Sequence, residues 1–189
     1  MSTIGLLLAA GAGRRMGRPK ALVESWLADA VTGLHGGGCD RVVVVLGARA
    51  DEARPLLEGY DAEVVVADDW DEGMGASLRR GLMTLREGDG IAALVSLVDL
   101  PDVGPEVVRR LLDRPVGSQT LARAAYDGTP GHPVLIGRDH WAGVVGSATG
   151  DRGARTYLGR HEVELVECGD LATGMDVDAR PTRGQPEPE

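Results

Sequence analysis

The chain has 189 residues, a formal net charge of −9 and 43% hydrophobic residues, which predict one domain with a substantial core. This negative charge argues against general binding to nucleic acid or to an anionic membrane. The two cysteines, Cys39 and Cys168, fit no disulfide framework or CxxC metal pattern. Since residues 1–8 lack a signal-peptide pattern and no apolar run approaches a membrane span, we expect a cytoplasmic protein.

In the first half of the chain, continuous apolar runs typical of buried strands alternate with helical patterns. The expected strands are 4–9, 41–46, 63–67 and 91–98. The expected helices are 26–34 after a Ser25 cap, 51–57 with Pro55 in the first turn, one carrying the stripe Leu78, Leu82 and Leu85, and one that starts at 104–106. Strands alternating with helices predict a three-layer α/β fold with a mainly parallel sheet.

The second half of the chain is less regular. Strands are expected at 120–126 and 132–136, joined by a turn at 127–130 that introduces an antiparallel member, and a further strand at 162–167. Short helices are expected at 141–145 and 153–158. Prolines and a low apolar content predict a disordered tail at 180–189, which leaves 1–179 as a single domain.

The loop after the first expected strand is the most informative segment. The first 23 residues contain four cations and no acidic residue, although the whole chain is acidic. Glycine-rich backbone N–H groups and cations suit a polyanion, most simply a nucleoside triphosphate. The loop lacks the Gly-Lys-Ser/Thr of a P-loop, and Pro19 delays any helix beyond a dinucleotide fingerprint at Gly11, Gly13 and Gly17. We therefore expect an extended loop along a phosphate chain, with a solvated basic loop as the alternative.

Asp99 is the main candidate metal ligand. It follows an apolar strand and should emerge at the carboxyl edge of the sheet, where α/β proteins bind ligands. A carboxylate there suits Mg²⁺, which takes one or two protein carboxylates and leaves other positions to phosphates and water. The alternative is a carboxylate that caps the turn before Pro101. Asp176 is a second candidate ligand, or simply a solvated acid near the C-terminus.

Two further glycine-containing segments have both a functional and a structural interpretation. Residues 73–78 form a glycine turn before a helix, where small residues permit the approach of a base and Ser77 can bond to its edge; otherwise these glycines only shape the loop. Residues 131–133 and 150–155 carry His132, Asp151 and Arg155. A single histidine without a metal-spaced partner is more often structural.

Taken in order, these segments resemble the MobA-like nucleotidyltransferases, most closely the molybdenum cofactor cytidylyltransferases. Residues 8–20 resemble the family signature LAAGxxxRMGxxK, and 73–78 its GMGxSL. Residues 99–101 resemble its D-hydrophobic-P, 131–135 its GHPVL, and 150–155 its GDxGAR. The resemblance spans residues 3–178. It differs in a short connection between Lys20 and the first helix, and in the sequence after Asp176.

The resemblance implies a Rossmann-like, GT-A-like nucleotidyltransferase fold with a mixed sheet of about seven strands. It also implies transfer of a nucleoside monophosphate to a phosphorylated acceptor, with Mg²⁺ and release of pyrophosphate. The implied nucleotide-binding residues are Leu8, Ala9, Ala10, Gly11, Gly13, Gly75 and Ser77. Lys20, Arg15 and Asp99 are the implied catalytic residues, with Lys20 at the α-phosphate and Asp99 and Asp176 on the metal. His132, Asp151 and Arg155 are implied on the acceptor side.

The wording Ala9-Ala10-Gly11 resembles cytidylyl members, whereas guanylyl relatives more often carry Ala-Gly-Gly, so CTP is the expected nucleotide. The implied acceptor is molybdopterin or its molybdenum form, with a recipient molybdoenzyme or its chaperone as partner. One alternative is cytidylyl or guanylyl transfer to a sugar phosphate or another small phosphorylated acceptor. Another is an oxidoreductase that uses NADP or a flavin, with Arg49 reading the 2′-phosphate, because some MobA-like proteins are assigned to redox chemistry on pigments.

Overall fold

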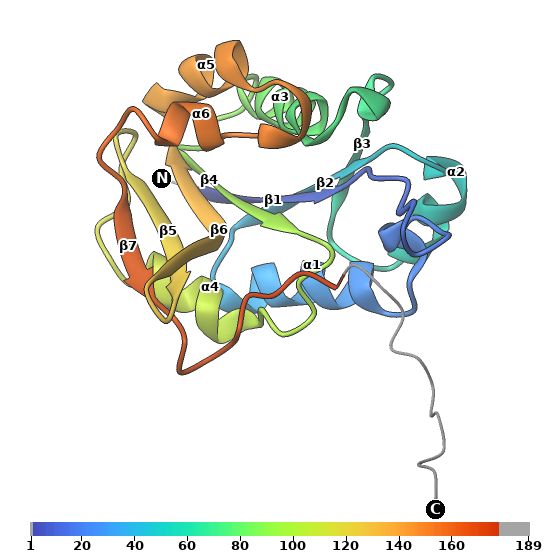
Figure 1. Cartoon of the computed structure of the whole chain (residues 1–189), viewed down its shortest axis with the longest axis horizontal. Coiled ribbons are helices and arrows are strands. Elements are labelled where there is room, and N and C mark those ends of the chain that lie inside the picture. Colours follow the sequence, from blue (N-terminus) through green and yellow to red (C-terminus); the bar gives the residue numbers. More distant parts are fainter. Residues whose placement is uncertain (1, 178–189) are drawn as a thin grey trace, which may run out of the picture.

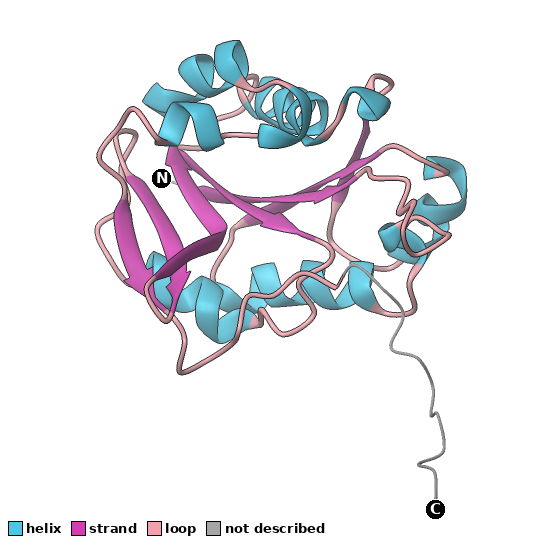
Figure 2. Cartoon of the chain, viewed as in Figure 1, coloured by secondary structure: helices cyan, strands magenta, loops and turns pink. Residues whose placement is uncertain are grey.

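The computed structural model describes residues 2–177, which form one seven-stranded mixed sheet between two layers of helices (Figures 1 and 2). The strands are β1 Thr3–Ala9, β2 Arg41–Leu46, β3 Glu63–Val66, β4 Ala92–Leu97, β5 Leu121–Tyr126, β6 Thr129–Gly137 and β7 Glu164–Glu167. Their order across the sheet is β3-β2-β1-β4-β6-β5-β7. Only β6 runs against its neighbours, β4 and β5. The predicted α/β architecture is confirmed.

The helices cover both faces of this sheet. They are α1 Trp26–Gly37, α2 Ala50–Ala53, α3 Met74–Leu85, α4 Pro105–Leu112, α5 Arg138–Ser147 and α6 Arg155–Leu158. Short 3₁₀ helices are η1 Lys20–Leu22, η2 Arg54–Leu57, η3 Trp70–Glu72 and η4 Gly150–Arg152. In Figure 1, α1 and α4 lie below the sheet, and α3, α5 and α6 lie above it.

The core is divided by the sheet into two layers, which explains why the central strands are apolar throughout. Alternate residues of a strand point to opposite faces. In β1, Leu7 packs into the cluster that contains Leu27 and Leu111 of α1 and α4. Its neighbour Leu6 packs into the cluster that contains Leu82 and Trp141 of α3 and α5. A parallel sheet covered on both faces therefore needs apolar residues at successive positions.

Three local expectations differ from the structure. The helix expected at 51–57 is split into α2 and η2 at Arg54-Pro55, since proline lacks the N–H that would continue the helix. Ser25 precedes α1 as expected, but its φ is 64° and its side chain makes no capping bond, so the predicted Ser25 cap is wrong. The hairpin turn is confined to Asp127 and Gly128, both with positive φ, so β6 begins earlier than predicted.

Two further expectations concern membrane-spanning helices and the C-terminal tail. No helix within residues 2–177 is long and apolar enough to cross a membrane. The tail expected at 180–189 lies outside the described residues.

Candidate functional site

A cavity of about 430 Å³ opens where β1 and β4 end, at the carboxyl edge of the sheet. Many of the residues singled out in the sequence line it together. They are Leu8, Ala9, Ala10, Gly11, Gly13, Arg15, Lys20, Ser77, Asp99 and Asp151. Two segments about 80 residues apart in the chain therefore meet in one cavity, because β1 and β4 are parallel neighbours.

The glycine-rich loop reaches the cavity as irregular backbone, since no helix begins before η1 at Lys20. Gly13 makes this path possible. Its φ is +58°, and a Cβ there would lie 1.9 Å from the Arg18 carbonyl oxygen, so only glycine fits. The Met16 N–H donates to the Gly13 carbonyl at 2.9 Å and closes a tight turn. The loop thereby places Arg15 at the cavity without the helix that a dinucleotide fingerprint requires.

Lys20 and Asp99 form an ion pair inside the cavity. Lys20 Nζ lies 2.5 Å from Asp99 Oδ2, and the two side chains are only 18% and 14% exposed. Because water is largely excluded, the Coulomb interaction between them is stronger than in a surface pair. This pair matches a metal–triphosphate complex. The anionic phosphate oxygens suit the Lys20 ammonium group, and the divalent ion suits the Asp99 carboxylate.

The donor set of this cavity fits a magnesium ion bound together with phosphate. Asp99 supplies a hard oxygen ligand, and within residues 2–177 its second carboxylate oxygen has no hydrogen-bond or ion-pair partner. No group of three or more metal-ligating side chains occurs in the same described part of the chain. Such a sparse set suits Mg²⁺, which usually keeps waters and substrate phosphates among its ligands.

A further part of the cavity lining was predicted only in part. Gly73 and Met74 belong to the segment 73–78 that was expected at the base, whereas Trp70, Asp71 and Glu72 were not predicted. Gly73 has φ +109°, and a Cβ there would lie 2.7 Å from Asp151 Oδ1, so the glycine lets η4 approach the cavity. The signal available in the sequence is a tryptophan within an acidic run directly before a glycine turn.

Four predicted site residues do not line the cavity: Gly75, His132, Arg155 and Asp176. Gly75 is buried in α3, and a Cβ there would lie 2.8 Å from the Thr149 backbone nitrogen, so it serves close packing. Asp176 is exposed, but the N–H of the next residue, Val177, donates to the Asp99 carbonyl at 3.0 Å. The chain near the C-terminus therefore passes directly beside Asp99.

His132 lies on β6 outside the cavity lining, and its imidazole interacts electrostatically with Asp99. Burial and the Arg123 cation lower the pKa of the His132 imidazole to about 4, and Asp99 acts in the opposite direction. The imidazole is therefore neutral at pH 7. Arg155 also lowers this pKa, but less than burial and Arg123 do.

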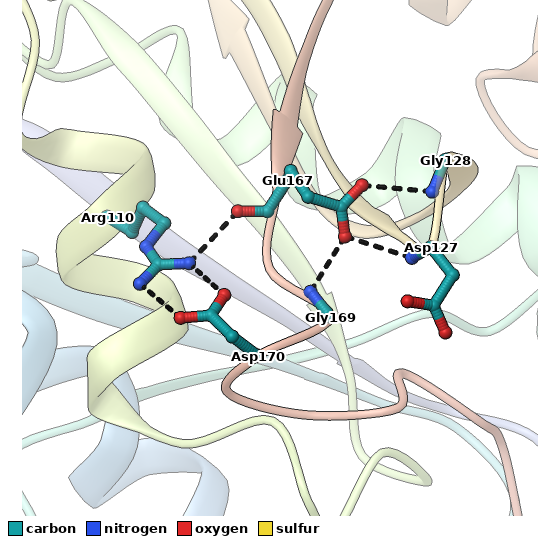
Figure 3. Close-up of polar contacts among 6 residues, drawn as sticks. All are labelled: Arg110, Asp127, Gly128, Glu167, Gly169 and Asp170. Carbon is teal, nitrogen blue, oxygen red and sulfur yellow. Dashed lines mark hydrogen bonds and ion pairs between the residues drawn. The ribbon is translucent and has the colours of Figure 1, made fainter.

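The segment that leads to Val177 is held by contacts around the end of β7 (Figure 3). The Glu167 carboxylate accepts N–H groups of Asp127, Gly128 and Gly169 at 2.8–2.9 Å. Arg110 of α4 donates to the Glu167 carbonyl at 3.0 Å and pairs with Asp170. These contacts tie the β5–β6 turn, α4 and the last segment together, so they direct the chain toward Asp99.

We expect these bonds to make stability depend on pH. Backbone hydrogen bonds from Gly128 and Gly169 lower the pKa of Glu167 below 4.5. A carboxyl whose pKa is lower in the folded state stabilises it fully above the unfolded value and loses that contribution as the pH falls through the folded value. Glu167→Gln should therefore flatten the fall in stability below pH 4.5.

The measurement is urea unfolding between pH 6 and pH 3.5. Glu162→Gln is the matched control, because Glu162 is exposed and makes no side-chain hydrogen bond or ion pair within residues 2–177. Identical pH dependence in the wild type and both variants would contradict the prediction.

Comparison with known proteins identifies the family. Residues 5–165 match the model of the MobA-like NTP transferase domain. The chain is 40% identical to "Nicotine blue oxidoreductase" of Paenarthrobacter nicotinovorans, covering 92% of this chain and 91% of that protein. It is 26% identical to a "Probable molybdenum cofactor guanylyltransferase" of Mycobacterium ulcerans (strain Agy99), over 97% of this chain and 83% of that protein.

Among solved structures, the chain is similar to Rv0371c from Mycobacterium tuberculosis H37Rv in complex with manganese. The TM-score is 0.74 at 26% identity, and the match covers 94% of each chain. With the seven-stranded sheet and the cavity at its carboxyl edge, these similarities agree with the expected family. The chain belongs to the MobA-like NTP transferase family.

Proposed function

We propose that the protein transfers CMP from CTP to the phosphate of molybdopterin or its molybdenum form and releases pyrophosphate. The observation that carries this proposal is the Lys20–Asp99 pair at 2.5 Å, in the cavity that the glycine-rich loop also lines. That arrangement suits a magnesium–nucleotide complex better than a neutral ligand. The cytidylyl choice is supported by Ala10, which is buried at the cavity where guanylyl relatives more often carry glycine.

The reaction is an in-line displacement at phosphorus. An oxygen of the acceptor phosphate forms a bond to the α-phosphorus of CTP, the bond to the β-phosphate bridging oxygen breaks, and pyrophosphate leaves with that electron pair. Such transfers depend on positioning and charge neutralisation rather than on a protein nucleophile. Lys20 and Arg15 neutralise developing negative charge, and backbone N–H groups of the glycine-rich loop hold the phosphates.

Asp99 is the residue that would hold Mg²⁺, with Asp176 as a second carboxylate brought near by the Val177–Asp99 backbone bond. When bound, the ion neutralises phosphate charge and orients the leaving group. The manganese complex of the similar protein Rv0371c supports a divalent ion as a ligand of this protein.

A second candidate function is an NADP- or flavin-dependent oxidoreductase, which the 40% identity to "Nicotine blue oxidoreductase" favours. The geometry of the cavity supports this function less well than nucleotidyl transfer. Arg49, the expected reader of a 2′-phosphate, is exposed, does not line the cavity and pairs with Glu52. The loop at Gly11–Gly17 also lacks the helix N-terminus that a dinucleotide pyrophosphate uses.

A thermal-shift panel of CTP, GTP, ATP and NADPH, each with and without Mg²⁺, tests these alternatives. We expect CTP with Mg²⁺ to raise Tm most, and pyrophosphate release to require both CTP and the phosphorylated pterin. Stabilisation by GTP would change the nucleotide, and turnover with a sugar phosphate would change the acceptor. Stabilisation by NADPH alone, or a yellow purified protein, would favour the oxidoreductase.

Trp70 gives a direct optical test of where the base binds. Trp70 lines the cavity, whereas Trp141 is 1% exposed in the core. We expect nucleotide to quench the emission of Trp70. Trp70→Leu should weaken nucleotide binding about 5- to 150-fold, since base–aromatic stacking is worth ~1–3 kcal/mol. Trp26→Phe, which alters a tryptophan of α1 outside the cavity lining, is the control; unchanged affinity in Trp70→Leu would place the base elsewhere.

A further inference from the structure

β3 forms one end of the sheet, and its outer edge pairs with no other strand in the part of the chain that the structure describes (Figure 1). Successive residues of a strand direct their backbone groups to opposite neighbours. Because the Ala67 N–H donates to the Leu46 carbonyl of β2, Val64 and Val66 direct their N–H and C=O groups outward. These groups can pair with a further strand.

The β3 edge lacks the usual protection against such pairing. Proteins commonly protect an edge strand with proline, lysine or a bulge. The β3 sequence Glu-Val-Val-Val contains neither of these residues, and no bulge interrupts its pairing with β2. Its one charged residue, Glu63, is paired with Arg41 of β2. The edge is therefore open to another strand.

Beside this edge, β3 and α3 form a hollow of about 420 Å³. Its lining comes from three valines of β3 and from outward-facing residues in and just after α3: Val64, Val65, Val66, Arg80, Met83, Thr84 and Glu87. The Met83 side chain is 55% exposed, so a large apolar group lies uncovered in the hollow. Burying this side chain against a partner would be favourable.

The charges of the hollow complement themselves. Arg80 and Glu87 both line it, with Met83 between them, and within residues 2–177 neither charged side chain has an ion-pair partner. Two copies of α3 that pack antiparallel about Met83 and Thr84 would place Arg80 of each copy opposite Glu87 of the other. One cation and one anion cancel, so this surface does not repel a second copy although the chain carries −9.

A two-fold axis also fits the strand edge. Antiparallel pairing centred on Val65 would join Val64 of each copy to Val66 of the other through reciprocal N–H···O=C bonds. In this register Glu63 would face Ala67 of the other copy, so no like charges meet across the strands.

The strand and the helix can share this axis. α3 links β3 to β4, which are parallel strands of the same sheet, so α3 runs in the opposite direction to both. Arg80 therefore lies closer than Glu87 to the carboxyl end of β3. Reversing the strand about Val65 brings this end next to the amino end of the other copy, where Glu87 lies.

We propose that the β3 edge and the outward face of α3 bind a second copy of this chain and form a symmetric dimer. The contact consists of a four-residue strand and one helix face, so its affinity depends on few contacts and the dimer forms at high protein concentration. The axis points the carboxyl edges of the two sheets in opposite directions. The inference is therefore independent of the proposed function, because neither copy contributes to the cavity of the other.

The test measures the association of the full chain by analytical ultracentrifugation between about 1 and 200 µM. Arg80→Glu and Glu87→Arg each place like charges opposite one another, whereas the double variant restores opposite charges. Arg86→Glu is the matched control, because Arg86 is exposed directly after α3 and does not line the hollow. Amide hydrogen exchange at Val64 and Val66 over the same concentrations reports the strand contact.

We expect a monomer–dimer equilibrium in the wild type and in Arg86→Glu. The dissociation constant should be about fivefold higher or more in each single variant and return to within about threefold in the double variant. Exchange at Val64 and Val66 should slow as the concentration rises. A monomer throughout, a double variant as weak as the single variants, or exchange independent of concentration would each overturn the interface. Should a single variant fail to fold, amide exchange in the wild type decides.

Discussion

Replacing Lys20 with alanine is expected to lower turnover about 10²–10³-fold, the cost of removing one preorganised charge from a phosphoryl-type transition state. The Lys20 side chain is only 18% exposed and its ammonium nitrogen lies 2.5 Å from Asp99 Oδ2 in the cavity, so water screens its charge only weakly. Its charge opposes the negative charge that grows at the α-phosphate. The rate of pyrophosphate release at saturating CTP measures this effect.

The control for Lys20→Ala is Arg80→Ala, which removes an exposed cation of α3 outside the cavity. Circular dichroism and Tm confirm that each variant folds, because Lys20→Ala also leaves the Asp99 carboxylate unpaired. A Lys20→Ala protein that is folded and turns over at the wild-type rate would contradict the role given to this residue.

Asp99→Asn should abolish metal-dependent turnover, with a loss of about 10³-fold or more, since a bound metal ion contributes several kcal/mol of charge stabilisation. The amide keeps the size of the side chain but removes the anionic oxygen that a hard cation prefers. Titration of Mn²⁺ in the presence of CTP, followed by electron paramagnetic resonance, measures the binding directly. We expect the wild type to bind the ion and Asp99→Asn to bind it at least tenfold more weakly.

Asp102→Asn serves as the control for Asp99→Asn. Asp102 lies in the same turn, but it accepts hydrogen bonds from Thr173 at 2.5–2.7 Å and does not line the cavity. Metal binding should survive this change. Equal loss in both variants would mean that the turn as a whole, rather than the Asp99 carboxylate, supports the metal.

The sheet was predictable because its signal is local. A strand covered on both faces must be apolar at every position, and β2 satisfies that with Val42–Leu46. Helix starts were predictable where proline marks the first turn, as at Pro105 of α4. Conformations set by the surroundings were not predictable: Ser25 adopts φ 64° at the short connection before α1, although serine is a common helix cap.

The residues of the site also fall into those that the sequence predicted and those that it did not. The glycine-rich loop and the strand-end Asp99 were each predicted to bind part of a ligand, and Asp99 was placed at the carboxyl edge of the sheet. The structure brings both into one cavity because β1 and β4 are parallel neighbours. Trp70 was missed, although it lies in an acidic run directly before the glycine turn at Gly73. His132 and Asp176 lie near Asp99 without lining the cavity, and Arg155 does not line it either. Their roles are proposals.

A crystal structure with CTP and Mn²⁺ tests the central claim most directly, because anomalous scattering locates the ion independently of the nucleotide. We predict manganese at the Asp99 carboxylate, with the triphosphate lying along Gly11–Gly17 and its α-phosphate next to Lys20. Nucleotide and manganese bound away from both Asp99 and the glycine-rich loop would contradict the account.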